Sequence, residues 1–350
     1  MDIKNLFEKA VADNASDIFI IAGRPLSYSN GVDINGYGEK LTPKDTKIII
    51  EKIYDLTNRP IDDFIRKHDD DFSLSIPGLS RFRVNAFMQR GSYSAVLRVV
   101  KFDFPSHNEL NIPQEIIDIS NLTKGMILVT GPAGSGKSTT LTCLVDKINK
   151  TRASHIITLE DPIEFLHSHN KSIVSQREIH IDTNSYKDGL RAALREAPNV
   201  ILLGEMRDHE TTSIAIRAAE TGQLIFSTLH TLGAANSIDR IIDVFPPSQQ
   251  QQIRIQLSMV LQAVISQQLI PTLDGQLTPV FEIMFCNNAI RSMIRDSKIH
   301  QINTYIKSSS NEGMISMDRS LLNLYNNNII SKENALIYAL NPTDMKNKLG

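Results

Sequence analysis

The chain has 350 residues, of which 41% are hydrophobic and 22% charged, and its formal net charge is -2. This length allows about two domains, and the composition is that of a globular protein. The near-neutral charge argues against a strongly basic nucleic-acid binder, and the two cysteines, Cys143 and Cys286, give neither a zinc motif nor a disulfide framework.

The first ten residues carry charges and no long apolar run, so no secretory signal is expected. No stretch approaches the roughly 18 apolar residues of a membrane span. The low cysteine content is typical of a reducing cytosol. We therefore expect a cytoplasmic protein that contacts a membrane only through partners.

Residues 1–101 mix helical and strand patterns. A helix is expected in IKNLFEKAVA, and strands in SDIFIIAG and DDFSLSI. SRFRVNAFMQRGSYSAVLRVVKF predicts a hairpin with its turn at Gln89-Arg90-Gly91-Ser92. The prolines of FDFPSHNELNIPQ predict a linker and hinge over 102–113, between a first domain of residues 1–101 and a second of residues 114–350.

After residue 113, short apolar strands alternate with helices, which predicts α/β class and a mostly parallel sheet covered on both faces. The expected strands are GMILVT, ASHIITLE, VILLGE, LIFSTLH and QLTPVFEIMF. The expected helices are YKDGLRAALREAPN, ended by Pro198, and HETTSIAIRAAETG, capped by Gly222. The later chain is otherwise expected to be chiefly helical.

A glycine-rich stretch, GPAGSGKST, lies between a predicted strand and a predicted helix. It fits G-x-x-x-x-G-K-[ST], in which the glycines let backbone N–H groups surround phosphate oxygens and the helix adds its positive end. Lys137 is expected at the β- and γ-phosphates and Ser138 at Mg²⁺. An ordinary glycine-rich turn is the alternative. The predicted nucleotide-binding residues are Gly131, Pro132, Ala133, Gly134, Ser135, Gly136, Lys137, Ser138 and Thr139.

Candidate catalytic groups follow three later strands. TLEDPIEF contains Glu160, Asp161 and Glu164, ILLGEMRD contains Glu205, and STLHT contains His230. The carboxyl ends of strands are where open α/β sheets bind ligands, and hydrolysis needs a group that orients a water. For His230 a structural role and a chemical role both remain open.

These motifs together resemble the secretion-type hexameric ATPases, most closely the PilT family of type IV pilus retraction ATPases. The corresponding segments, in order, are ASDIFI, SRFRVNAF, GPAGSGKSTT, TLEDPIEF, QREIHIDTNSY, LRAALREAPNVILLGEMRD, AAETG, STLHT, SIDRIIDVFPPSQQQQIR and AIRSMIRDSKIHQI. The resemblance implies a PAS-like N-terminal domain, a RecA-like P-loop ATPase domain and a homohexameric ring. It further implies a motor that uses ATP and Mg²⁺ for pilus retraction and twitching motility. The expected partner is the cytoplasmic part of the pilus platform protein at the inner face of the membrane, without direct contact to nucleic acid.

The resemblance also assigns roles to residues. Glu205 matches the Walker B glutamate and is the leading candidate to orient the water, with Glu160 second. Ser138, Glu160 and Asp161 are the expected Mg²⁺ ligands. Glu160, Asp161 and Glu164 match the Asp box, and His230 matches the His box. A glycine precedes Glu205 where other P-loop ATPases commonly carry an aspartate, which leaves metal coordination by Walker B open.

Three N-terminal arginines are further candidates. Arg81 and Arg83 share one strand face and Phe82 and Val84 the other, a pattern that by itself is typical of a solvated face. The resemblance implies instead that Arg81, Arg83 and Arg98 reach the nucleotide at a subunit boundary, where they stabilise phosphate charge.

NAIRSMIRDSKIHQI predicts an amphipathic helix late in the chain. Ile290 and Ile294 recur at helical spacing, and Arg291 and Arg295 share a second face. A solvated helix face explains this pattern. The resemblance implies a coupling role in retraction, carried by Ile290, Arg291, Ile294 and Arg295.

Several alternatives stay open. A pilus assembly ATPase or type II secretion ATPase of the same superfamily usually carries extra N-terminal domains and a tetracysteine zinc element. A pilus accessory retraction ATPase is possible as well. From other classes, a RecA-like DNA-binding ATPase would want a basic groove, and a nucleotide-binding regulator would not hydrolyse ATP.

Overall fold

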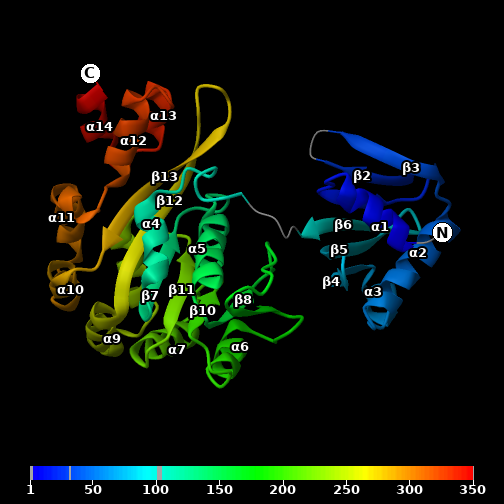
Figure 1. Cartoon of the computed structure of the whole chain (residues 1–350), viewed down its shortest axis with the longest axis horizontal. Coiled ribbons are helices and arrows are strands. Elements are labelled where there is room, and N and C mark those ends of the chain that lie inside the picture. Colours follow the sequence, from blue (N-terminus) through cyan, green and yellow to red (C-terminus); the bar gives the residue numbers. More distant parts are fainter. Residues whose placement is uncertain (1–2, 31–32, 101–104, 350) are drawn as a thin grey trace. The chain divides into compact units, whose positions relative to one another are not determined.

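The computed structural model describes residues 3–30, 33–100 and 105–349, and its contacts divide the chain into two compact units (Figure 1). The first comprises Met1–Phe104 together with Glu164–Leu166, and the second Pro105–Ile163 and His167–Gly350. The first residues of the predicted linker, up to residue 104, lie outside the described part of the chain. None of the described helices is long and apolar enough to cross a membrane.

The first unit is a six-stranded antiparallel sheet in the order β3-β2-β1-β6-β5-β4. Along β5, Phe82 and Val84 are buried and Arg83 is exposed, which is the predicted alternation. Arg90 and Gly91, both with positive φ, form the predicted hairpin turn between β5 and β6. The elements are α1 (Ile3–Ala12), β1 (Asp17–Ile20), β2 (Pro25–Ser29), β3 (Ile34–Lys40), α2 (Pro43–Leu56), α3 (Asp62–Lys67), β4 (Asp69–Ile76), β5 (Ser80–Gln89) and β6 (Ser92–Val100).

The second unit is a seven-stranded sheet in the order β13-β12-β7-β11-β10-β8-β9, parallel except for the β12–β13 pair. The predicted α/β class and mostly parallel sheet are therefore confirmed. The first half of the unit contains α4 (Gln114–Asp118), β7 (Gly125–Thr130), α5 (Lys137–Thr151), β8 (His155–Glu160), β9 (Ile173–Glu178), α6 (Tyr186–Ala193), β10 (Val200–Leu203), α7 (His209–Glu220) and β11 (Leu224–Leu229). The second half contains α8 (Ala234–Asp243), α9 (Pro247–Val260), β12 (Leu261–Pro271), β13 (Leu277–Phe285), α10 (Asn288–Arg295), α11 (Ile302–Ser308), α12 (Met317–Asn326), α13 (Lys332–Ile337) and α14 (Pro342–Leu349).

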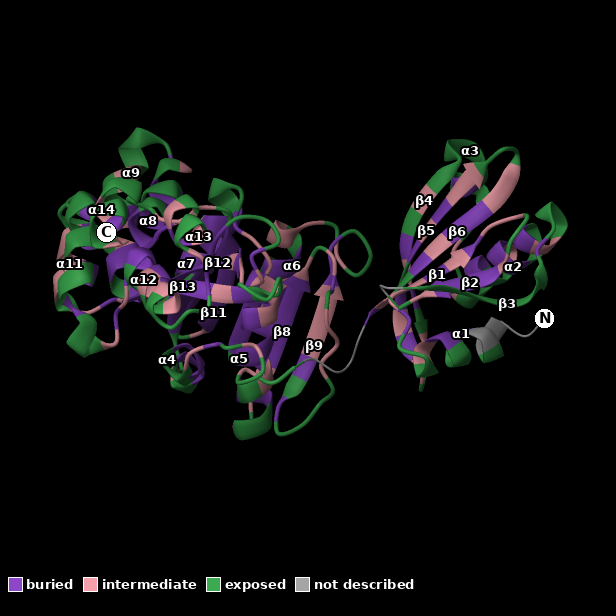
Figure 2. Ribbon diagram, turned by 90° about the horizontal axis from the view of Figure 1, so that it is seen from above, coloured by how far each residue is buried: buried purple, intermediate pink, exposed green. Residues whose placement is uncertain are grey.

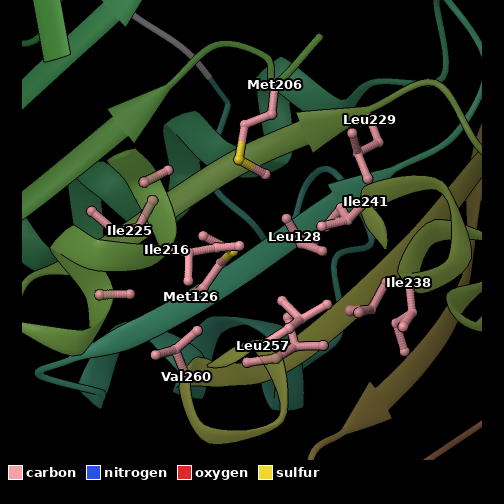
Figure 3. Packing of buried hydrophobic residues seen from close by; sticks show 14 of the residues in the cluster. Met126, Leu128, Met206, Ile216, Ile225, Leu229, Ile238, Ile241, Leu257 and Val260 are labelled. Atoms are coloured by element: carbon pink, nitrogen blue, oxygen red, sulfur yellow. The ribbon is translucent and has the colours of Figure 1, made fainter. Parts of the chain in front are cut away.

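Both faces of this sheet are buried, and Figure 2 shows β8 and β11 coloured as buried along most of their length. Met126 and Leu128 of β7 join a core cluster with residues of α6 to α11, whereas Ile127 and Val129 join a cluster with residues of α4 and α5. Figure 3 shows side chains of the first cluster, including Met206 and Leu229. Burial on both faces explains why these strands read as continuous apolar runs.

Three features of the second unit differ from expectation. The later chain contains β12, a strand of 11 residues that pairs with β7, and β9 adds an edge strand beside β8. The predicted helix YKDGLRAALREAPN ends earlier, at Ala193. Ala197, just before Pro198, has a φ of 50°, a left-handed conformation outside the helical region.

Candidate functional site

The glycine-rich loop connects β7 to α5, as its motif predicts. Gly131 and Gly136 have φ values of 142° and 85°. A Cβ atom on Gly131 would lie 2.1 Å from the carbonyl oxygen of Gln267 on β12. The loop therefore requires glycine at its first position for space as well as for backbone conformation.

Two polar side chains of the loop are buried. Lys137 is 8% exposed, and its Nζ donates to the carbonyl oxygens of Gly131 (2.9 Å) and Pro132 (2.8 Å). The buried hydroxyl of Ser135 has no hydrogen-bond partner within the described part of the chain. An ammonium, an unpaired hydroxyl and the N-terminus of α5 are groups that fit a phosphate. Ser138 and Thr139 lie in the first turn of α5 and are half-buried.

Glu205 follows β10, and His230 follows the neighbouring strand β11. Oε2 of Glu205 lies 2.7 Å from Nε of Arg207 and 3.7 Å from Nε2 of His230. The Glu205 side chain is 12% exposed, while those of Arg207 and His230 are 77% and 57% exposed. Met206, which follows Glu205, and Leu229, which precedes His230, are buried in the core (Figure 3). The backbone at both Glu205 and His230 is therefore anchored.

Arg207 was not predicted as a functional residue, although it is part of the GEMRD motif. Its hydrogen bond and charge interaction with Glu205 raise the pKa of the Arg207 guanidinium. The carboxylate of Glu205 therefore already carries a cation partner. A sequence motif identifies both residues but not that they pair.

Glu160 ends β8, the strand next to β10. Its Oε1 accepts hydrogen bonds from Oγ1 of Thr158 (2.6 Å) and Nε2 of Gln176 (3.2 Å). Asp161 and Glu164 are exposed. No group of three or more histidine, cysteine, aspartate or glutamate residues could hold a metal ion by itself in the described ranges.

The glycine before Glu205 has a structural cause. A Cβ atom on Gly204 would lie 2.5 Å from the hydroxyl of Tyr186 and 3.2 Å from the carbonyl oxygen of Leu159. Burial, together with the nearby carboxylates of Glu205 and Asp161, raises the pKa of Tyr186. Tyr186 therefore takes the space that an aspartate would need. A cleft of about 400 Å³ is lined by residues that include Asp161, Tyr186, Glu205, Arg207 and Asp208.

In the first unit, strand register brings two of the candidate arginines together. Arg83 on β5 lies directly opposite Arg98 on β6, and Arg98 lies opposite Asp17 on β1. Nε of Arg98 is 2.9 Å from Oδ1 of Asp17. Arg83 is exposed and has no ion-pair partner among the described residues, and Arg81 is half-buried.

The late helix, α10, corrects part of the coupling prediction. Ile290 and Ile294 are fully buried in the core, so neither can contact a partner directly. Arg295 is 49% exposed and donates to Oγ of Ser292 at 2.8 Å. The two isoleucines anchor α10 in the core, and among the four predicted coupling residues Arg295 is the one with an exposed side chain.

Arg291 makes three hydrogen bonds within the fold. Its Nη1 donates to the carbonyl oxygens of Ser258 (2.6 Å) and Met259 (2.9 Å), and its Nη2 donates to Oε1 of Gln262 (3.1 Å). The last carbonyl groups of a helix have no partner within that helix. Arg291 therefore caps the C-terminal end of α9 and also contacts the start of β12.

The contact between Gly204 and Tyr186 can be tested by unfolding. Gly204→Ala should lower the free energy of unfolding by about 1–3 kcal/mol, because the new Cβ meets the Tyr186 hydroxyl and the Leu159 carbonyl. Combining it with Tyr186→Phe should restore part of that loss, because the hydroxyl is gone. Urea unfolding of the wild type, both single variants and the double variant measures the coupling. Strictly additive losses would contradict the contact.

Comparisons with known proteins agree with this geometry. A family model described as "Type II/IV secretion system protein" matches residues 1–305. The type IV pilus retractation ATPase PilT of Pseudomonas aeruginosa is 43% identical over 336 residues, covering 96% of this chain and 97% of that protein. A twitching motility protein of Neisseria gonorrhoeae is 48% identical over 276 residues, covering 79% of this chain and 74% of that protein.

The fold is also that of a solved motor protein. A crystal structure of the pilus retraction motor PilT with bound ADP superimposes with a TM-score of 0.88 at 41% identity, covering 99% of each chain. The predicted two-domain secretion-ATPase fold and the predicted enzyme class, an ATPase, are thereby confirmed. The chain belongs to the Type II/IV secretion system protein family and is similar over nearly its whole length to PilT retraction ATPases, as its motifs predicted.

Proposed function

We propose that this chain is a hexameric, Mg²⁺-dependent ATPase that powers retraction of a type IV pilus. The observation that carries the proposal is the arrangement at one edge of the sheet. The P-loop, His230 and Glu205 follow the adjacent parallel strands β7, β11 and β10, and Glu160 is the last residue of the next strand, β8. The relatives named for pilus retraction and twitching motility support the same function.

ATP is proposed to bind at residues 131–139. Lys137 and the backbone N–H groups of the loop hold the β- and γ-phosphates, and the start of α5 adds its positive end. Ser138 supplies one oxygen ligand to Mg²⁺, and the carboxylates of Glu160 and Asp161 contact it directly or through water, as suits a hard cation that keeps part of its hydration. Mg²⁺ held by these residues would supply positive charge that balances the charge of the phosphates.

Glu205 is proposed to orient the attacking water. Its carboxylate is largely buried, and its backbone continues into the core through Met206, so its position is well defined. The ion pair with Arg207, 2.7 Å from Nε to Oε2, fixes the orientation of the carboxylate that is proposed to accept a hydrogen bond from water. Glu160 and His230 are proposed as further catalytic groups. Nε2 of His230 lies 3.7 Å from Oε2 of Glu205, so a movement of either side chain affects the other.

The N-terminal arginines are proposed to act across a subunit boundary of the hexamer. Like charges directly opposite each other on neighbouring strands destabilise a sheet. Arg83 and Arg98 face each other in this way, Arg98 is already paired with Asp17, and an anion such as the γ-phosphate would offset the charge of Arg83. We propose that Arg81, Arg83 and Arg98 reach the nucleotide of the neighbouring subunit, with the 102–113 segment as the hinge.

Retraction requires that movement about the proposed 102–113 hinge is transmitted to the pilus machinery. We propose that the partner is the cytoplasmic part of the pilus platform protein, so that the motor works at the inner face of the membrane and is held there only by partners. Arg295 is the exposed member of the predicted coupling set and the residue best placed to contact another domain or a partner. No direct contact with nucleic acid is part of the proposal.

Glu205→Gln tests the chemistry. Nucleotide binding should stay within about twofold of wild type, while ATP turnover should fall by about 100-fold or more, because an amide cannot replace the carboxylate that orients the water. The matched control is Glu210→Gln, since Glu210 lines the same cleft but pairs with Lys187 at 2.8 Å.

In a strain lacking the gene, Glu205→Gln should leave excess pili and no surface motility. Absent pili after deletion would instead indicate an assembly ATPase.

Arg83→Ala tests the role of the arginines. Turnover by the hexamer should fall by about a thousandfold, the lower end of the effect of an arginine finger, while the melting temperature should stay the same or rise slightly, because the side chain is exposed and lies opposite Arg98. Arg66→Ala is the control, since Arg66 is an exposed arginine of the same unit paired with Asp63 at 2.6 Å. Normal turnover in Arg83→Ala hexamers would rule out the phosphate contact.

Arg295→Ala and Arg291→Ala separate coupling from stability. Both variants should keep ATPase activity and reduce retraction in cells. Arg291→Ala should also lower the free energy of unfolding by about 1–3 kcal/mol, because carbonyl groups at the end of α9 lose their donors. Arg295→Ala should change stability by less than about 0.5 kcal/mol. Arg240→Ala, at an exposed position of α8, is the control. Full retraction with Arg295→Ala would contradict the coupling role and indicate that this face of α10 is an ordinary solvated surface.

A further inference from the structure

Gln267 is a buried amide on a face of β12 where the preceding residues are apolar. It is 3% exposed, and Ala263 and Ile265 precede it on the same face of β12, where they join the core cluster that contains α5 residues. Burying an amide is unfavourable unless its polar atoms find partners. The partners of Gln267 therefore indicate why a glutamine stands there.

The side chain of Gln267 contacts the helix that carries the phosphate-binding residues. Its Oε1 accepts a hydrogen bond of 2.8 Å from Oγ1 of Thr140, a fully buried residue in the first turn of α5. Thr140 is three residues beyond Lys137 and two beyond Ser138. Both side chains are buried, so this hydrogen bond is shielded from competing water.

Gln267 also contacts both ends of the loop. Its carbonyl oxygen lies 2.1 Å from the position of a Cβ on Gly131, and its Nε2 lies 2.8 Å from the position of a Cβ on Gly136. Glycine is needed at 131 because the obstacle there is backbone, and it is favoured at 136 because φ is 85°. The first residue of the loop, its last residue and the helix after it are thus all packed against one side chain and its backbone.

We propose that Gln267 is a positioning residue that holds the P-loop in the conformation that binds nucleotide. The inference rests on the proposed function, since it concerns the same nucleotide site. Gln267 acts through the loop and α5. With its amide in place, the loop glycines and the start of α5 are already held in position, and Lys137 only has to exchange its loop carbonyl acceptors for phosphate oxygens. Without it, binding must first order the loop, and affinity falls by the fraction of molecules in the competent conformation.

A loop-positioning role predicts a particular kinetic pattern. The P-loop holds phosphates of ATP and ADP alike, so losing the positioning residue weakens both ground-state complexes. Uniform loss of binding raises KM and leaves kcat nearly unchanged. Loss of a residue that acts on the water, such as Glu205, gives the opposite pattern.

The test compares two neighbouring glutamines in the full chain. Gln267→Met keeps the volume and removes the amide, and should raise the Kd for a fluorescent ADP analogue and the KM for ATP about tenfold, as expected for one lost buried hydrogen bond. Its kcat should stay within about twofold. The control is Gln268→Met. Gln268 is 6% exposed and donates through Nε2 to the carbonyl oxygen of Tyr338 at 3.2 Å. The Gln268→Met variant should bind ADP with the affinity of the wild type.

Thr140→Val supplies an independent test that keeps shape and removes only the donor. It should weaken ADP binding to a similar degree, and adding Gln267→Met should weaken binding little further, because both changes remove the same hydrogen bond. Unchanged ADP affinity in Gln267→Met, equal weakening in Gln268→Met, or additive effects with Thr140→Val would overturn the proposal. A wild-type chain that binds ADP but does not hydrolyse ATP would overturn the proposed function instead, while the ADP comparison still decides the role of Gln267.

Discussion

Four strands, β7, β11, β10 and β8, end at one edge of the second unit's sheet because parallel hydrogen bonding keeps them in register. Thr130 pairs with Leu229, and Leu203 pairs with both Ser227 and Leu159. The residues that follow these strands therefore emerge side by side, although they lie up to about a hundred positions apart in the sequence. The order and register of the strands, more than the loops, therefore set which side chains become neighbours at this edge.

β12 links this edge to the opposite end of the sheet. A Cβ on Gly125, at the start of β7, would lie 2.7 Å from Nε2 of Gln262, and Arg291 of α10 donates to Oε1 of the same glutamine. At the other end of β12, Gln267 packs against the P-loop. Helix α10 and the phosphate-binding loop thus contact the same strand. Protein interiors are close-packed, so a displacement at one end of such a strand is resisted along its length.

The sequence was sufficient for elements with clear periodicity and insufficient for contacts between distant segments. The β5–β6 hairpin, the strands β7, β8, β10 and β11 of the parallel sheet and the P-loop follow from alternation, apolar runs and a motif with its context. β12 escaped prediction because LQAVISQQLIP contains two adjacent glutamines whose partners, Thr140 on α5 and Tyr338 just after α13, lie far away in the sequence. The cap that Arg291 forms on α9 was missed for the same reason: helical spacing assigns a face to a side chain but does not identify its acceptor.

The site divides into anchored and movable parts. The P-loop glycines, Glu160 and Glu205 are held by the sheet edge and by buried neighbours, whereas the side chains of Arg207 and His230 are largely exposed. Fixed acceptors and loop groups can keep the phosphates and the water in place through a cycle. Exposed cations can exchange partners at little cost, since surface ion pairs contribute only about 0–1 kcal/mol. In the proposed motor, the nucleotide state can therefore change which cation contacts the site while the backbone of the site stays in place. Such an exchange of partners would transmit the nucleotide state from one subunit to the next.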